Sequence, residues 1–316
     1  MHKRSITLDW MKCFLMALVV LGHAIQWQRC DFQAHWLWSR IYAFHMPAFF
    51  FLSGYFSWKE KRRLSSDIVR VIGLLVPCYV WFLLSAATIR SGALWFLFNL
   101  AIFILLAMIQ KFVSLLLGVK EWIVCLIVLS GLYVVFLIDC SFIAWLRINC
   151  IPFFFMGYFV KCYHLETCVF TDKGKIFVGV CLASAILLMF CFGCLSGMAR
   201  GVIRGLIAFS MTFGCFGFFI RMSECFDKAP CHQHSGIGVN CSKVGQMTLG
   251  IYASHYFFLA LLSKLKTEFH YLMDFIIAFL LSVAFCLIIK RLPVFDFLLL
   301  GNTRKLKEYI NNFRYM

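Results

Sequence analysis

The chain has 316 residues, of which Ala, Val, Ile, Leu, Met, Phe, Trp, Tyr and Cys make up 63% and charged residues only 14%. Soluble domains carry about 25% charged residues, so this composition excludes a soluble globular fold. The net charge of +16 is found mainly in short loops between apolar stretches. The positive-inside rule explains that distribution without nucleic acid. The composition therefore indicates an all-α integral membrane protein, and we expect no nucleic-acid partner.

Most of the 16 cysteines lie inside apolar stretches, where cysteine behaves as a small hydrophobic residue. The polar loop 225–241 differs because it gathers residue types that bind zinc. These are Cys225, Cys231, His232, His234 and Cys241. Their spacing matches no standard zinc site. We therefore expect no metal cofactor.

Apolar stretches of about 20 residues, the length that crosses a bilayer as a helix, recur along the whole chain. We predict ten such helices, near residues 10–28, 36–57, 68–89, 94–110, 122–138, 145–161, 176–193, 201–220, 246–263 and 271–289. Lys and Arg are abundant in the loops on the side of the N-terminus and sparse in the others, which predicts that both termini are cytoplasmic. Residues 1–300 are expected to form a single transmembrane domain, followed by a basic cytoplasmic tail at 301–316.

The first predicted helix carries three ionisable residues on nearly one face. Lys12 and His23 are eleven positions apart, almost three turns, and Asp9 lies about one turn before Lys12. Ionisable groups are costly to bury in a bilayer and are usually functional there. The face predicts a charged pair at the cytoplasmic interface and a reactive histidine at depth. The alternative is a snorkelling lysine and a packed histidine.

Two further predicted helices each carry a histidine near mid-membrane. In the second helix, His45 lies two positions before Pro47, which removes a backbone donor and favours an opening there. In the ninth helix, Tyr252 and His255 share a face with Thr248. Each histidine alone is compatible with a packed core residue, but three histidines on three helices favour a catalytic site.

Arg70 enters the third predicted helix from the cytoplasmic side. Arginine keeps its charge, and its planar guanidinium binds phosphate or carboxylate groups. Arg70 is therefore a candidate ligand for an anionic cofactor. A snorkelling interfacial arginine is the equal alternative.

Four stretches spread over most of the chain carry a family resemblance. They are Leu8-Asp9 through Gly22-His23, Phe44-His45-Met46-Pro47 through Gly54, Leu94-Trp95-Phe96-Leu97, and Gly245 through His255. They resemble the integral-membrane acyltransferase-3 family, in its branch similar to fucose 4-O-acetylases and other polysaccharide O-acetyltransferases. The resemblance implies a ten-helix core that passes an acyl group, usually acetyl, from a cytoplasmic CoA thioester to a sugar hydroxyl. It also implies that His23 is catalytic, and many relatives have arginine at the position of Lys12.

The chemistry of a buried imidazole agrees with that implied reaction. Burial disfavours the charged imidazolium, so a neutral His23 is expected to accept a proton from the acceptor hydroxyl as general base. His45, Tyr252 or His255 would then donate a hydrogen bond to the oxyanion. Direct transfer and an acyl-histidine relay both fit the residues.

The expected partners follow from this interpretation. Acetyl-CoA is the expected donor, its phosphates bound by Lys12 and Arg70, with Asp9 supporting catalysis beside Lys12. The expected acceptor is a sugar or glycan of a capsule, an exopolysaccharide or a lipid-linked precursor. The expected location is the bacterial inner membrane, as a multi-pass protein in the lipid bilayer, and a homo-oligomer is compatible with the sequence.

Two other functions compete with acyl transfer. Buried charged residues also build substrate paths, so a transporter or flippase of a polysaccharide precursor is the main alternative. A non-catalytic membrane scaffold explains the three embedded histidines poorly.

Overall fold

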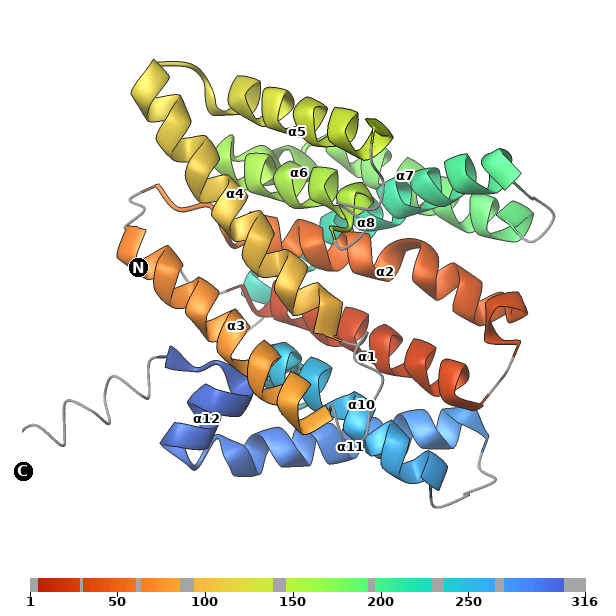
Figure 1. The fold of residues 1–316 in the computed structure, drawn as a ribbon. Helices are drawn as coiled ribbons and strands as arrows, with labels where there is room; N and C mark the ends of the chain where they lie inside the picture. The colour runs from red at the N-terminus through yellow and green to blue at the C-terminus, as the bar shows by residue number, and fades with distance from the viewer. Residues whose placement is uncertain are drawn as a thin grey trace, which may run out of the picture. The chain divides into compact units, whose positions relative to one another are not determined.

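The computed structural model describes residues 5–28, 31–60, 64–85, 94–138, 146–192, 197–228, 236–264 and 270–303, and this part of the chain is helical and without strands (Figure 1). The α-helices are α1 (Ile6–Gln28), α2 (Trp36–Tyr55), α3 (Leu64–Ser85), α4 (Trp95–Leu117), α5 (Glu121–Ile138), α6 (Ile151–Cys162), α7 (Asp172–Cys191), α8 (Gly197–Lys228), α9 (Gly236–Gly245), α10 (Thr248–Lys264), α11 (Tyr271–Ile289) and α12 (Pro293–Leu300). Short 3-10 helices are η1 (Phe32–Ala34), η3 (Ile148–Cys150) and η4 (Leu165–Phe170). Each of the ten predicted membrane helices coincides with one α-helix, while α9 and α12 are additions to that prediction.

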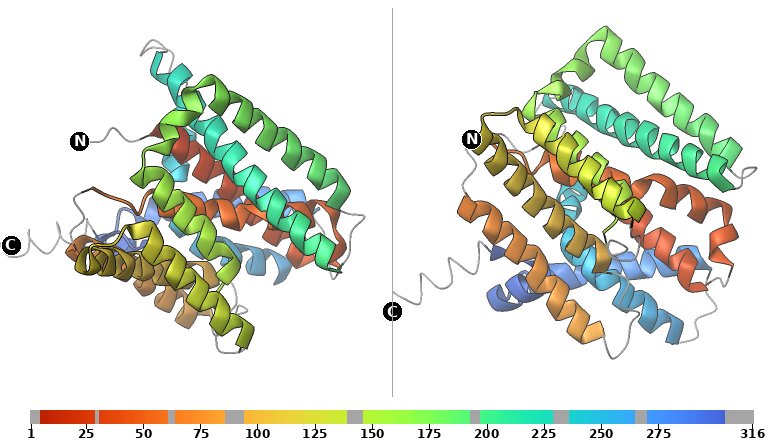
Figure 2. Two further views of the ribbon diagram at one scale, coloured as in Figure 1. Left: turned by 90° about the horizontal axis from the view of Figure 1, so that it is seen from above. Right: turned by 45° about the horizontal axis from the view of Figure 1, so that its top comes forward.

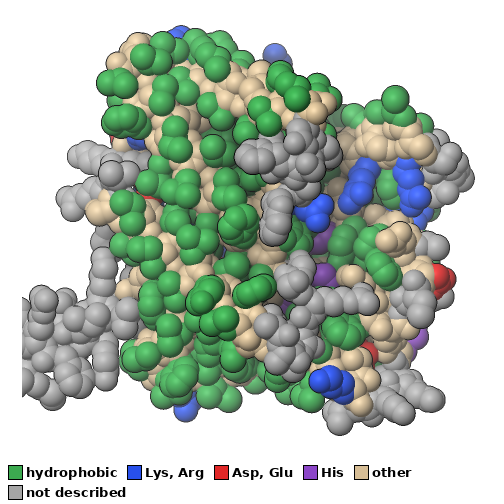
Figure 3. All heavy atoms as spheres, viewed as in Figure 1, with side chains coloured by type: hydrophobic (Ala, Val, Ile, Leu, Met, Phe, Trp, Pro, Cys, Tyr) green, Lys and Arg blue, Asp and Glu red, His purple; other side chains and the backbone are tan. Residues whose placement is uncertain are grey.

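Seven helices in the described part are long and apolar enough to cross a membrane, namely α1, α3, α4, α5, α7, α8 and α11. α6 and α10 are shorter, with 12 and 17 residues. Large apolar side chains point outward, such as Leu137, which is 81% exposed, and Phe190, which is 76% exposed. Hydrophobic side chains also cover α3 and α4 on the face drawn in Figure 3. Lipid is the solvent that suits these surfaces, so the chain is an all-α, multi-pass integral membrane protein.

The described helices divide into two compact units, and the first comprises Met1–Phe49 and Leu165–Ile288. Its centre is α1, which packs against α8, α9 and α10. α7 and α8 lie side by side as an antiparallel pair, drawn in green and teal in Figure 2. Because α1 has three helical neighbours, its polar side chains face protein as well as lipid.

The second unit comprises Phe50–His164 and Ile289–Met316, and its core is aromatic. Phe50, Phe103 and Phe154 are fully buried. The ring centroids of Phe50 and Phe103 lie 4.8 Å apart, and those of Phe103 and Phe154 lie 5.7 Å apart. Each unit therefore combines an early and a late segment of the chain, and neither half of the sequence forms a unit alone.

Within the second unit, the end of α2 and the helix α6 touch backbone to backbone at two glycines. A Cβ atom at Gly54 would overlap the carbonyl oxygen of Phe154. A Cβ atom at Gly157 would overlap the carbonyl oxygen of Phe51. Small residues at a close helix crossing are typical of membrane proteins, where backbone approach takes the place of a hydrophobic driving force.

Some predicted features lie outside the described residues. They include most of the basic tail, from residue 304 onward, and the zinc-type residues Cys231, His232 and His234, together with the side chain of Cys225. Within the described residues, no group of three His, Cys, Asp or Glu side chains is arranged to hold a metal ion.

Candidate active site

Three histidines from three helices meet in the first unit. The ring of His23 in α1 lies with its centroid 5.2 Å from that of His255 in α10. Tyr42 of α2 connects His23 to His45, because its ring centroid lies 6.0 Å from that of His23 and 4.8 Å from that of His45. The structure thus brings together all three histidines that the sequence singled out.

His45 and His255 are both held by the backbone of their own helix. His45 Nδ1–H donates to the carbonyl oxygen of Ile41 at 2.6 Å, and His255 Nδ1–H donates to that of Ile251 at 2.9 Å. A carbonyl only accepts, so each ring carries a proton on Nδ1, and in the neutral ring that burial favours Nε2 then carries a lone pair. Both residues are 1% exposed. They are therefore buried, neutral hydrogen-bond acceptors.

His23 differs because it is partly exposed and is oriented by side chains. Its Nδ1 lies 3.0 Å from Gln26 Oε1 and 3.2 Å from the Tyr42 hydroxyl. The Tyr42 hydroxyl also donates to Gln26 Oε1 at 3.4 Å. An amide oxygen only accepts, so His23 Nδ1 carries the proton and Nε2 carries the lone pair. The other ring nitrogen of His23, Nε2, takes no part in these contacts.

Gly22 makes room for Tyr42 beside His23. A Cβ atom at Gly22 would lie 2.7 Å from Tyr42 Cε2. The Tyr42 ring is stacked on Trp38 at a centroid distance of 4.1 Å, which restricts its retreat. Arg204 of α8 donates to the Tyr42 carbonyl at 3.0 Å. A residue larger than glycine before His23 would therefore collide with Tyr42.

The predicted face of α10 supplies one more tyrosine than expected. Tyr252 is 4% exposed, and its ring centroid lies 5.9 Å from that of His255. Tyr256 was not singled out by the sequence, yet its ring lies 5.3 Å from His23 and 6.1 Å from His255. The histidines are therefore enclosed by phenol groups of α2 and α10.

Gln26 and Tyr42 were also missed by the sequence prediction, although helical spacing carries a signal for both. Gln26 follows His23 by three residues, and Tyr42 precedes His45 by three residues. Side chains at that spacing are neighbours on a helix surface. Which of several such neighbours completes a site depends on how the helices are rotated, and only the structure shows that.

Asp9 and Lys12 form a separate group near the start of α1. Lys12 Nζ lies 3.1 Å from Asp9 Oδ1, and Ser242 Oγ of α9 donates to Asp9 Oδ2 at 3.3 Å. A Cβ atom at Gly245 would overlap the Asp9 carbonyl oxygen, so the end of α9 lies directly on α1. Asp9 is about 21 Å along α1 from His23. The structure therefore groups Asp9 with Lys12 and α9, and not with the histidines.

Arg70 lies in the second unit, where its guanidinium caps the end of α2. Nη1 donates to Ser57 Oγ at 2.9 Å and to the Phe56 carbonyl at 3.4 Å, and Nη2 donates to the Ser53 carbonyl at 3.5 Å. The last carbonyls of a helix lack backbone donors, so this contact stabilises the helix end. Arg70 thus has a structural role, and phosphate binding by Arg70 stays a prediction.

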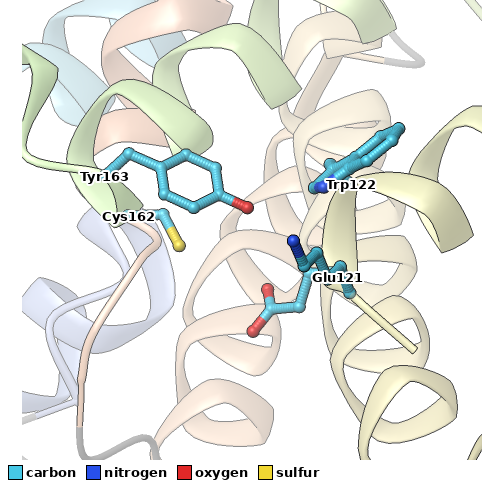
Figure 4. Close-up of a pocket in the computed structure, with 5 residues that line it drawn as sticks. Glu121, Trp122, Cys162 and Tyr163 are labelled. Atoms are coloured by element: carbon cyan, nitrogen blue, oxygen red, sulfur yellow. The ribbon is translucent and has the colours of Figure 1, made fainter. Parts of the chain in front are cut away.

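A hollow of about 470 Å³ in the second unit holds none of the predicted site residues. It is lined by Lys120, Glu121, Trp122, Cys162 and Tyr163. Figure 4 shows Cys162 and the Tyr163 ring on one side and Glu121 with Trp122 on the other. The carboxylate of Glu121 accepts a hydrogen bond from a buried tyrosine, Tyr158, at 2.8 Å. Aromatic and basic side chains at helix ends are typical of the membrane interface, so the hollow is a weaker candidate than the histidine site.

The fold and the site define a multi-pass membrane protein in which three histidines of three helices lie together. The sequence model of the Acyl_transf_3 family, described as an acyltransferase domain, matches residues 5–92 and 67–291. The chain belongs to this family.

Two curated proteins are similar to one part of the chain. Nodulation protein NolL of Sinorhizobium fredii (strain NBRC 101917 / NGR234) is 36% identical over 91 residues, which cover 25% of this chain and 24% of that protein. Nodulation protein NolL of Mesorhizobium japonicum (strain LMG 29417 / CECT 9101 / MAFF 303099) is 36% identical over 89 residues, which cover 25% of this chain and 23% of that protein. The match thus spans about a quarter of the length of these relatives. No solved structure matches the chain.

Proposed function

We propose that this member of the family is a membrane acyltransferase, which moves an acetyl group from cytoplasmic acetyl-CoA to a hydroxyl of a cell-surface glycan or its lipid-linked precursor in the bacterial inner membrane. The observation that carries the proposal is the orientation of His23. Gln26 and Tyr42 hold its Nδ1 side, which leaves the Nε2 lone pair for a substrate. Membership of an acyltransferase family favours group transfer over the alternative of a transporter or flippase.

The proposed reaction is a direct attack on the thioester. The acceptor oxygen forms a bond to the carbonyl carbon while His23 Nε2 takes the hydroxyl proton. The C–S bond then breaks, and the imidazolium returns the proton to the departing thiolate, so that free CoA leaves. The rival acyl-histidine relay would leave radioactive acetyl on the protein when labelled donor is added without acceptor.

The oxyanion of the tetrahedral intermediate needs a hydrogen-bond donor. His45 and His255 donate their Nδ1 protons to backbone carbonyls, so in this tautomer their Nε2 atoms accept and do not donate. A phenol can donate, and Tyr252 is the remaining predicted residue beside His255. We therefore propose that the Tyr252 hydroxyl donates the hydrogen bond to the oxyanion and that the two histidines have a positioning role.

The donor is proposed to enter from the side of Lys12. Lys12 lies about 16 Å along α1 from His23, so the phosphates of an extended CoA can remain at the interface while its thioester reaches the histidine. Asp9 binds Lys12 at 3.1 Å and thereby positions the ammonium group. Arg70 is the second proposed phosphate ligand.

The test uses the purified chain in lipid nanodiscs with acetyl-CoA and a lipid-linked glycan, and it measures release of free CoA. His23→Ala is expected to lower acceptor-dependent release by about a hundredfold or more, the usual contribution of a general base. His164→Asn is the matched control, because His164 lies outside the site at a backbone φ of 52°, which asparagine tolerates. Near-normal release of CoA by the His23→Ala variant would exclude His23 as the base. If the unsubstituted protein released no CoA in response to the acceptor, glycan acetylation would be excluded.

A further inference from the structure

A buried carboxylate lies near the end of α1, beyond the histidines. Asp274, in the first turn of α11, is 5% exposed. Its Oδ2 accepts a short hydrogen bond of 2.6 Å from Gln28 Nε2. Its Oδ1 is buried and has no hydrogen-bond partner among the residues that the structure describes. Buried carboxylate oxygens are normally paired, so Oδ1 indicates a place where a ligand donates a hydrogen bond.

Gln28 and its neighbour Trp27 place this carboxylate along α1 from His23. Gln28, which binds the carboxylate, follows His23 by about 7.5 Å along α1. The ring of Trp27 lies 5.3 Å from that of Tyr256, which in turn lies 5.3 Å from that of His23. Trp27 is partly exposed, and its buried Nε1–H also has no partner in the described part of the chain. Ring faces and an unused donor thus lie beside His23, and the unused acceptor, Asp274 Oδ1, lies on the carboxylate that Gln28 binds further along α1.

Aromatic side chains also border the carboxylate on α11. Tyr271 precedes Asp274 by three residues, so the two share one face of the helix. The Tyr271 ring lies 5.5 Å from that of His35, which precedes α2, and 4.0 Å from that of His270. His270 is exposed, and the other two rings are partly exposed. The buried carboxylate is therefore bordered on α11 by aromatic rings that are themselves accessible.

We propose that Asp274, Gln28 and Trp27 bind a sugar ring of the acceptor and present one of its hydroxyls to His23. A sugar ring has apolar C–H faces that suit aromatic rings, and its hydroxyls both donate and accept. One hydroxyl donates to Asp274 Oδ1, and another accepts from Trp27 Nε1–H. The proposal rests on the proposed function, because it assigns the acceptor side of that same active site.

The arrangement also selects the class of sugar. A carboxylate in the site repels a carboxylate on the substrate, so acidic sugars are disfavoured. A buried group built to bind a hydroxyl is left unpaired when the substrate lacks that hydroxyl, which makes such sites strongly selective. The expected acceptor is therefore a neutral sugar with free ring hydroxyls.

The experiment measures how the enzyme in nanodiscs divides labelled acetyl groups of acetyl-CoA between a sugar and water. The probes are methyl glycosides of neutral hexoses and of hexuronic acids. Asp274→Asn, Gln28→Ala and Trp27→Leu are expected to lower the ratio of sugar acetylation to hydrolysis about tenfold or more. Gln28 is exposed, so its variant is expected to fold even where the buried substitutions do not.

Substitutions of another aspartate and another tryptophan serve as controls. Asp172→Asn removes a carboxylate that is 91% exposed and paired with Lys175 on α7, and Trp122→Phe changes an exposed ring of α5. Neither is expected to change the ratio. An unchanged ratio in Gln28→Ala, or faster acetylation of hexuronic acids than of neutral sugars, would overturn the acceptor site. If the unsubstituted protein neither acetylated a sugar nor hydrolysed acetyl-CoA, the proposed function itself would be overturned.

Discussion

At the scale of single residues, the chemistry of each histidine is decided by what its Nδ1 atom contacts. In His45 and His255 that partner is a carbonyl one turn earlier in the same helix, a bond that depends only on the helix itself. In His23 the partners are the side chains of Gln26 and Tyr42. The orientation of His23 therefore depends on residues that substitution can change without disturbing a helix.

Removal of the Gln26 amide tests that dependence. Gln26→Leu nearly keeps the size of the side chain but removes the partner of His23 Nδ1 that can only accept. The Tyr42 hydroxyl that remains can also donate, so the ring can adopt the tautomer that has no lone pair on Nε2. We expect kcat to fall about tenfold to a hundredfold with little change in KM for acetyl-CoA. The check is steady-state kinetics of CoA release. Gln26→Leu acting only on KM would contradict the positioning role.

Lys12 is expected to act on donor binding. A contact made equally in the ground state and the transition state affects KM and not kcat, so Lys12→Ala is expected to raise KM for acetyl-CoA about tenfold. Lys12→Arg keeps the positive charge and is expected to retain most of the activity. Kinetics with varied acetyl-CoA concentration check both variants. A collapsed kcat with unchanged KM would place Lys12 in the reactive machinery, or in support of Asp9.

At the scale of helices, the closest contacts are made by glycines whose missing side chains let one backbone reach another. Gly157 of α6 lies against the Phe51 carbonyl, whereas Gly131 of α5 has no atom within 4 Å of a Cβ placed there. Both glycines are inside helices, so an alanine gains similar helix propensity at each position. A comparison of alanine substitutions at the two positions therefore separates the effect of packing on stability from that of helix propensity.

Gly157→Ala is expected to destabilise the protein, while Gly131→Ala is expected to leave it as stable or more so. The first substitution forces α6 away from α2, and overpacking of this kind costs about 1–3 kcal/mol. Thermal unfolding in detergent, followed by loss of monodisperse protein, measures the difference. Equal melting temperatures for the two variants would show that the helices do not approach as closely as described.

At the scale of the whole molecule, the orientation in the membrane is the next property to test. Reporters fused after Lys61, after Lys173 and at the C-terminus are expected to report the cytoplasm, and a reporter after Arg90 is expected to report the outside. Lys61 and Arg90 lie outside the described residues, so their positions rest on the sequence. A reversed signal at any of these fusions would change the number of membrane crossings.

Much of the helical framework could be predicted from the sequence, because a bilayer requires long apolar helices and little else. The predicted span 271–289 coincides with α11, and the structure confirms an all-α membrane protein. α9 was missed because its sequence Gly236–Gly245 contains three glycines and several polar residues, which are poor helix formers. Its contact with Asp9 of α1 is a tertiary effect that no local pattern contains.

The candidate site was predictable to the same extent. Histidines are rare in membrane helices, so their positions in three separate helices predicted one site, and His23, His45 and His255 do lie together. The amide of Gln26 has no comparable signal, because one of many polar residues becomes important only when helix rotation turns it toward a partner. Asp274 is ionisable and lies within the predicted helix 271–289, but its partner Gln28 on α1 is visible only in the structure. The distance of Asp9 from the histidines follows from helix length and could have been calculated in advance.

Asp9 and Lys12 pair within one turn of a single helix, which matters while the chain is being synthesised. Ser242, the partner of Asp9 on α9, is 233 residues further along the chain. At about 5–20 residues per second, the ribosome therefore produces it more than about ten seconds later. Lys12, three residues away on the same helix, can neutralise the carboxylate during that time, so the pair adds no net charge to α1 as it enters the bilayer. The pair thus allows α1 to be inserted first and α9, which supplies Ser242, to be added much later.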